Sequence, residues 1–192
     1  MNIFAKRKQA VMLTVLLFTL NYAIDRITKL LAVRFLKDNE PIVLLHKLIV
    51  FTYTENSGAF LSMGKSWNIY IKYFVLLIIP IIVCILIALH LMIKENNIYR
   101  IVTGSCILGG GAGNLIDRLC NQFKVIDFMN FGIGNVRTGI LNMADISVTF
   151  GAILLLIFEL SSGSPHVKKQ VRQVKEPHRQ ANDAGRRSNG AR

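Results

Sequence analysis

Two aspartates lie in unusually apolar surroundings and could act together as an acid–base pair. Asp127 lies within the short run VIDF, and Asp145 lies within LNMADISVTFGAILLL, residues 141–156. Two carboxyl groups at one partly desolvated place repel each other, so one of them keeps a proton while the other is ionised. The ionised group can then take a proton from water while its partner donates one to a carbonyl oxygen.

Further polar side chains recur at helical spacing near these aspartates. Asn142 precedes Asp145 by three residues and therefore shares its helix face. In LGGGAGNLIDRL, Asn114 lies one turn before Asp117 and Arg118, which could simply mark the end of a helix. From spacing alone, a proteolytic pair and an ion or proton path both remain open. A small transporter subunit and a non-catalytic membrane scaffold are the alternative functions.

Asp25 and Lys29 are four residues apart, which puts them on one helix face. We expect them to form an i,i+4 ion pair near the outer end of the first apolar segment.

Long apolar segments must position these residues. The chain has 192 residues, 52% of them hydrophobic, and its mean hydropathy is +0.43. Four segments approach the roughly 20 residues that cross a bilayer: residues 11–31, 73–93, 101–119 and 140–160. The fold class predicted is therefore an all-α integral membrane protein with four transmembrane helices. The N-terminal run is expected to be a retained span. Gly109 and Gly113 predict close helix packing in the third span.

Basic residues indicate how the chain is oriented. Lys and Arg are more frequent in the first ten residues, in residues 94–100 and in the C-terminal tail than in the other connections. Both termini should therefore be cytoplasmic. Residues 1–160 are expected to form the membrane domain. Residues 161–192 should form a basic, disordered tail that contacts lipid headgroups. Because half of the net charge of +12 lies in this tail, no nucleic-acid partner is expected. The scattered histidines and unpaired cysteines predict no metal or cofactor.

Five blocks of sequence together resemble bacterial lipoprotein signal peptidase, also called signal peptidase II. In chain order they are DRITK (25–29), NSGAF (56–60), GGGAGNLIDR (109–118), VIDF (125–128) and NMAD (142–145). The chain departs from the family pattern modestly: Gly111 replaces a common alanine, and Leu141 replaces a phenylalanine.

The resemblance implies an aspartic endopeptidase of the bacterial inner membrane, acting as a monomer without a cofactor. Its substrate would be a diacylglyceryl-modified prolipoprotein. The enzyme would remove the signal peptide by cleaving just before the lipidated cysteine, at the outer face of the membrane. Asp127 and Asp145 match the family's catalytic pair. Six other positions match residues that bind substrate or support the pair: Asp25, Asn56, Gly58, Asn114, Arg118 and Asn142.

The resemblance also implies a small extracytoplasmic β cradle and a short amphipathic helix near Asp127. Leu48 to Thr54 is rich in β-branched and aromatic residues and predicts a strand of the cradle. Residues 129–135, MNFGIGN, are the candidate for the amphipathic helix.

Overall fold

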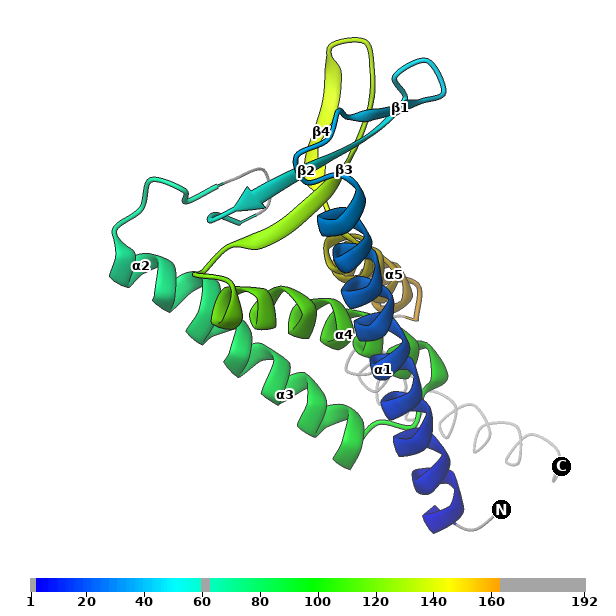
Figure 1. The fold of residues 1–192 in the computed structure, drawn as a ribbon. Coiled ribbons are helices and arrows are strands. Elements are labelled where there is room, and N and C mark those ends of the chain that lie inside the picture. The colour runs from blue at the N-terminus through cyan, green and yellow to red at the C-terminus, as the bar shows by residue number, and fades with distance from the viewer. Residues whose placement is uncertain (1–2, 60–62, 163–192) are drawn as a thin grey trace, which may run out of the picture. The chain divides into compact units, whose positions relative to one another are not determined.

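The computed structural model describes residues 3–59 and 63–162, in which long helices alternate with a small antiparallel sheet (Figure 1). The predicted tail therefore lies outside the described residues, apart from its first two positions. Residues 1–155 form one compact unit that contains the whole sheet and the first turns of the last helix. The elements in chain order are α1 (Ile3–Phe35), β1 (Ile42–Leu44), β2 (Ile49–Asn56), α2 (Ile69–Tyr73), the π-helical stretch Phe74–Ile78, α3 (Ile79–Ile93), α4 (Ile98–Cys120), β3 (Val125–Ile133), β4 (Val136–Leu141) and α5 (Met143–Ser162).

Among the described residues, three helical segments are long and apolar enough to cross a membrane. They are Phe4–Phe35, Ile69–Ile93 and Met143–Ser162. The predicted third span, residues 101–119, forms α4 but does not reach the same apolar character. Thr103, Ser105 and Asp117 are buried on this helix, so its polar residues face protein rather than lipid.

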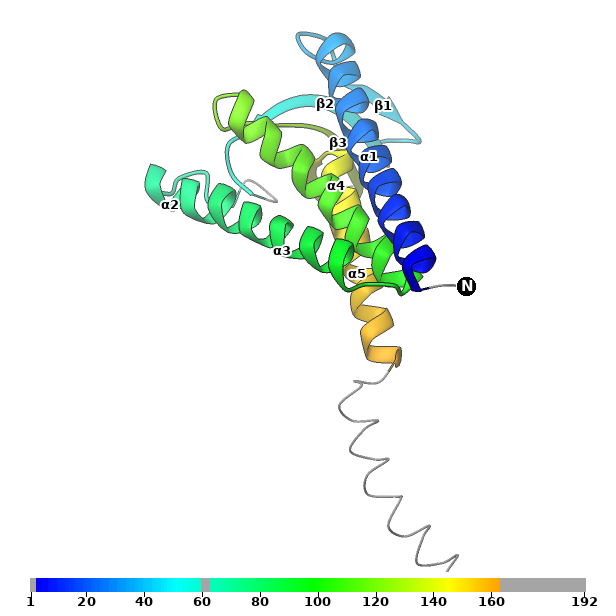
Figure 2. The same ribbon diagram turned by 90° about the horizontal axis from the view of Figure 1, so that it is seen from below.

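α4 is the helix against which the other helices pack. It contacts both α1 and α3, and Figure 2 shows it between them. A Cβ atom at Gly109 would lie 2.6 Å from the Cβ of Asn21, and one at Gly113 would overlap the carboxylate of Asp25. Both glycines therefore allow α1 to approach closely, as their spacing predicted. Gly110 faces the backbone of Ala144 in α5 in the same way.

The sheet has the strand order β1-β2-β3-β4, and every neighbouring pair is antiparallel. The predicted strand at Leu48–Thr54 corresponds to β2. The helix predicted at residues 129–135 is wrong, because these residues form the end of β3 and the turn into β4. Phe131 pairs with Ile49 of β2, and Gly134 takes a φ of +56° in the turn. Glycine disfavours a helix and supplies this turn conformation.

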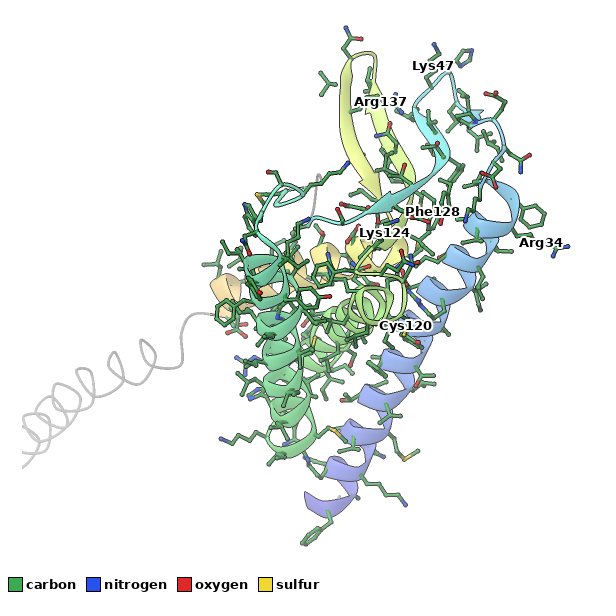
Figure 3. All side chains as sticks on the ribbon, turned by 60° about the vertical axis from the view of Figure 1, so that its left-hand side comes forward. Arg34, Lys47, Cys120, Lys124, Phe128 and Arg137 are labelled. Carbon is green, nitrogen blue, oxygen red and sulfur yellow. The ribbon has the colours of Figure 1, made fainter. Side chains whose placement is uncertain are left out.

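Two small apolar clusters hold the sheet and loops against the helices. Ala32 of α1 and Leu36, directly after α1, pack with Phe128 and Met129 of β3; Figure 3 labels Phe128 where the sheet meets the helices. Leu76, Leu77, Leu115 and Phe123 form the second cluster. The first cluster fixes β3 beside the C-terminal end of α1, and it is β3 that carries Asp127.

Candidate active site

Asp145 lies in the first turn of α5, where a reciprocal hydrogen-bond pattern caps the helix. The backbone N–H of Asp145 donates to Oδ1 of Asn142 over 2.9 Å. The backbone N–H of Asn142 donates to Oδ2 of Asp145 over 3.3 Å. This is a capping box in which an aspartate takes the place usually held by glutamate or glutamine. α5 begins at residue 143, not 140 as predicted, because residues 140 and 141 belong to β4.

Asp127 lies in the middle of β3 and is 2% exposed. Its Oδ1 accepts a hydrogen bond of 2.6 Å from Nδ2 of Asn142. Its Oδ2 accepts one of 2.9 Å from Nδ2 of Asn56, at the end of β2. The side chain of Asn142 thus binds Asp127, while its backbone N–H binds Asp145. The two aspartates come from different elements and are joined by one residue.

Asn114 of α4 completes the surroundings of Asp145. Its Nδ2 donates to Oδ1 of Asp145 over 2.8 Å. Its Oδ1 accepts hydrogen bonds from Nδ2 of Asn142, at 3.2 Å, and from Nζ of Lys29, at 2.9 Å. The three predicted asparagines therefore lie around the two carboxylates.

Arg118 and Gly58 lie beside this centre rather than on the carboxylates. Nη2 of Arg118 donates to the carbonyl of Gly58 over 2.9 Å. The N–H of Gly58 donates to Oδ1 of Asn56 over 2.9 Å. Nε of Arg118 is buried and has no hydrogen-bond partner among the described residues. The loop after β2 is therefore tied both to Asn56 and to the end of α4.

Asp25 is fully buried beneath the first turn of α5 and does not contact either aspartate. Its Oδ1 accepts from the backbone N–H of Ala144 over 3.0 Å. Its Oδ2 pairs with Lys29 at 2.9 Å and with Arg26 at 2.8 Å. The ion pair expected between Asp25 and Lys29 is present, but α1 continues to Phe35, so the pair is internal rather than at the helix end.

Sequence reasoning predicted the pairing of Lys29 with Asp25, but it missed Arg26 and the ion pairs of Asp117. Asp117 pairs with Nη1 of Arg26 at 2.6 Å and with Nζ of Lys29 at 2.8 Å. Lys29 is only 2% exposed, although lysine is among the residues least often buried. The spacing of Lys29 after Asp25 showed their pairing within α1, but nothing in the sequence shows the contacts with Asp117 of α4.

Burial and charge perturb the acid–base behaviour of Asp127. Burial, followed by the charge of Asp145, raises its pKa from 3.8 to about 6, against the opposing hydrogen bonds from Asn56 and Asn142. A carboxyl group in this range can keep a proton that an ordinary surface aspartate would lose. In the part of the chain described, no group of three or more His, Cys, Asp or Glu is placed to hold a metal ion.

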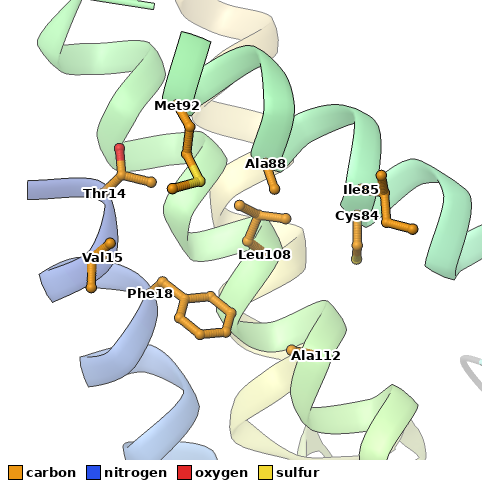
Figure 4. Close-up of a pocket in the computed structure, with 9 residues that line it drawn as sticks. All are labelled: Thr14, Val15, Phe18, Cys84, Ile85, Ala88, Met92, Leu108 and Ala112. Carbon is orange, nitrogen blue, oxygen red and sulfur yellow. The ribbon is translucent and has the colours of Figure 1, made fainter. Parts of the chain in front are cut away.

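A separate apolar cavity of about 330 Å³ lies between α1, α3 and α4 (Figure 4). None of the predicted site residues lines it. Its lining residues are Thr14, Val15, Phe18, Cys84, Ile85, Ala88, Met92, Leu108 and Ala112.

Comparison with known proteins gives a consistent match over most of the chain. A family model described as signal peptidase (SPase) II matches residues 17–161. The lipoprotein signal peptidase of Clostridium tetani is 34% identical over 146 residues, covering 75% of this chain and 90% of the relative. That of Chlorobium phaeobacteroides is 33% identical over 144 residues, covering 70% and 82%.

Two solved structures, each described as a bacterial membrane enzyme, share the fold. One has a TM-score of 0.67 at 27% identity, over 79% of this chain and 89% of that enzyme. The other has a TM-score of 0.63 at 25% identity, over 75% of this chain and 90% of that enzyme. The chain therefore belongs to the lipoprotein signal peptidase (signal peptidase II) family.

Proposed function

We propose that this chain is an aspartic endopeptidase that cleaves diacylglyceryl-modified prolipoproteins just before the lipidated cysteine. Its family membership makes it a membrane protease that removes signal peptides from lipoproteins. The proposal adds the catalytic type, the residues and the place of cleavage. Asp127 and Asp145 are the catalytic pair, and Asn56, Gly58, Asn114, Arg118, Asn142 and Asp25 support the pair or the substrate.

One observation carries this proposal: Asn142 binds both aspartates. Its Nδ2 donates to Asp127 over 2.6 Å, and its backbone N–H donates to Asp145 over 3.3 Å. A single residue that contacts both carboxyl groups holds them near each other, and the charge of Asp145 helps to raise the pKa of Asp127. We infer that the two carboxyl groups share one proton. A pair that shares a proton contains one acid and one base at the same pH, which peptide hydrolysis requires.

The reaction needs only these two groups and a water molecule. The ionised carboxylate removes a proton from water, whose oxygen attacks the carbonyl carbon of the scissile peptide bond. The protonated carboxyl group donates its proton to the carbonyl oxygen, giving a neutral tetrahedral intermediate. A proton then passes to the leaving nitrogen, and the C–N bond breaks. The asparagine amides hold both carboxyl groups in place through these steps.

Four helices are proposed to cross the inner membrane: α4 is the third of them in chain order, in addition to the three apolar segments. Its 23 residues would be roughly 34 Å long at the usual helical rise, enough for the hydrocarbon core. Both termini are placed in the cytoplasm, and the β sheet lies at the outer face. Asp127 and Asp145 then lie at the outer boundary, where a lipidated precursor presents its cleavage site.

Residues 1–160 are proposed to act as one peptidase domain and as a monomer. The basic tail, residues 161–192, would contact anionic lipid on the cytoplasmic side.

The experiment is cleavage of a purified lipoprotein precursor by the purified full chain in lipid, with the products identified by mass spectrometry. The proposal predicts a product whose N-terminal residue is the diacylglyceryl-modified cysteine. A matched precursor without the diacylglyceryl group is the control and should be cleaved much more slowly. Cleavage at another bond, or equal cleavage of both precursors, would contradict the proposed substrate.

A further inference from the structure

We propose that Lys29 is a positioning residue for the cleavage reaction, fixing the amide of Asn114 and through it the carboxylate of Asp145. Among the described residues, Lys29 forms ion pairs with Asp25 and Asp117 and a hydrogen bond with Asn114, and none with the pair itself. Its charge also acts on both carboxylates of the pair through space. The inference rests on the proposed function, because it assigns a further role within the same site.

The ammonium group of Lys29 is fully coordinated inside the protein. Nζ contacts Oδ2 of Asp25 at 2.9 Å and Oδ2 of Asp117 at 2.8 Å. Its third contact is Oδ1 of Asn114, at 2.9 Å. An ammonium group has three N–H donors and no acceptor, so these three oxygens use all of its hydrogen-bonding capacity. The side chain is thereby held in one position.

This contact determines which way the amide of Asn114 points. Since the ammonium group can only donate, the amide oxygen must face Lys29. The amide NH2 then faces Asp145, to which it donates over 2.8 Å. If the amide were reversed, its NH2 group would face the N–H donors of Lys29, and its oxygen would face the carboxylate oxygen of Asp145. Lys29, together with Nδ2 of Asn142 on the same oxygen, therefore selects the one orientation in which Asn114 binds the carboxylate.

The charges around Lys29 are balanced. Lys29 and Arg26 both pair with Asp25 and Asp117, so that two cations face two carboxylates. Asp25 also accepts the backbone N–H of Ala144, next to Asp145. The network therefore connects α1, α4 and the first turn of α5, and Lys29 is the member of it that contacts Asn114.

A double-mutant cycle between Lys29→Met and Asn114→Ala tests this role, with kcat and KM measured on the lipidated precursor. Lys29→Met should lower kcat about 10- to 100-fold, as for loss of a hydrogen bond to a charged group, and leave KM within about twofold. In the Asn114→Ala background, Lys29→Met should lower kcat less than about threefold further. Equal effects in both backgrounds, or an unchanged kcat in Lys29→Met, would overturn the proposal.

Two sets of controls separate positioning from folding. Glu95→Gln removes another buried carboxylate, which accepts the N–H groups of Asn96 and Asn97 far from the pair. It should lower thermal stability and leave kcat unchanged.

A second comparison is used if Lys29→Met does not fold. Lys29→Met is then combined with Asp117→Asn, which restores the charge balance, and the double variant is compared with Asp117→Asn alone. The same fall in kcat is expected, and no fall would overturn the proposal.

Asp127→Asn and Asp145→Asn are measured in the same assay. If either remains active, the proposed catalytic pair fails. If both are inactive while the cycle is additive, only the role of Lys29 fails.

Discussion

At the scale of single residues, the site depends on three asparagines whose amides all point in a fixed direction. In each of them, Oδ1 accepts from an N–H donor: Asp145 for Asn142, Lys29 for Asn114 and Gly58 for Asn56. In each, Nδ2 donates to a carboxylate of the pair. An aspartate at any of these positions could not donate, and would add a negative charge beside the pair.

The raised pKa of Asp127 makes stability depend on pH. The pKa rises to about 6 in the folded protein, so between pH about 4 and about 6 the folded state binds more protons than the unfolded chain. The free energy of unfolding should therefore fall by up to about 3 kcal/mol as pH rises through this range. Asp127→Asn should remove this contribution. The measurement is unfolding in detergent micelles across this pH range, and parallel curves for the two proteins would contradict the assignment.

Part of the site was predictable from single residues and part was not. The apolar surroundings of Asp127 and Asp145, and the spacing of Asn142, are visible in the sequence. The role of Asp25 beneath α5 is not, because spacing within α1 shows only its pairing with Lys29. Asp117 was interpreted as a possible helix-end residue, since nothing in the sequence shows that α1 brings Arg26 and Lys29 against it.

At the scale of elements, the start of α5 brings the pair together. Hydropathy placed the last span at 140–160, because apolar residues at the end of a strand resemble the start of a membrane helix. The structure assigns Ile140 and Leu141 to β4 and begins α5 at Met143. The start of the helix is marked by its N-cap residue, Asn142, whose side-chain oxygen accepts a backbone N–H of the first turn. The same strand-to-helix change puts Asn142 directly opposite β3.

The close approach of α1 and α4 gives a prediction at this scale. In Gly113→Ala, the new Cβ would overlap the carboxylate of Asp25, which is fixed by Lys29 and Ala144. Overpacking of this kind typically costs about 1–3 kcal/mol and should displace Asp25. We expect lower thermal stability and a large loss of cleavage.

Gly111→Ala is the matched control on the same helix. Its Cβ would lie 2.9 Å from Sγ of Cys84, the end of a side chain that can rotate. Near-normal stability and cleavage are expected. Equal damage from the two substitutions would show that α4 tolerates no alanine there, rather than that Asp25 is the sensitive contact.

At the scale of the whole molecule, the long helix that packs between α1 and α3 is the one not apolar enough along its length to count as a membrane span. α4 packs against α1 and α3, so part of its surface is covered by protein and can carry polar residues. The apolar segments indicated the membrane class, and the family resemblance supplied the β cradle, whose first long strand was predicted correctly. It did not predict that residues 129–135 form a hairpin, because the pairing of β3 with β2 and β4 depends on distant segments.

The proposed topology can be tested with the native cysteines. Cys84, Cys106 and Cys120 are free, and Cys120 is exposed at the end of α4. If α4 crosses the membrane outwards, a membrane-impermeant maleimide should label Cys120 in intact cells whose outer surface is accessible to it. The variant Cys120→Ser should abolish that labelling. Labelling of Cys120 only after the membrane is permeabilised would place this end of α4 in the cytoplasm.

The central claim is that Asp127 and Asp145 together hydrolyse the peptide bond. The most direct measurement is the turnover of a lipidated precursor by purified Asp127→Asn and Asp145→Asn, each verified as folded and membrane-inserted. Glu55→Gln, which removes a surface ion pair with Lys124 on the sheet, serves as the control and should keep its activity. The account predicts that each aspartate variant loses cleavage by at least about 10³-fold. Near-normal turnover by either variant would contradict it.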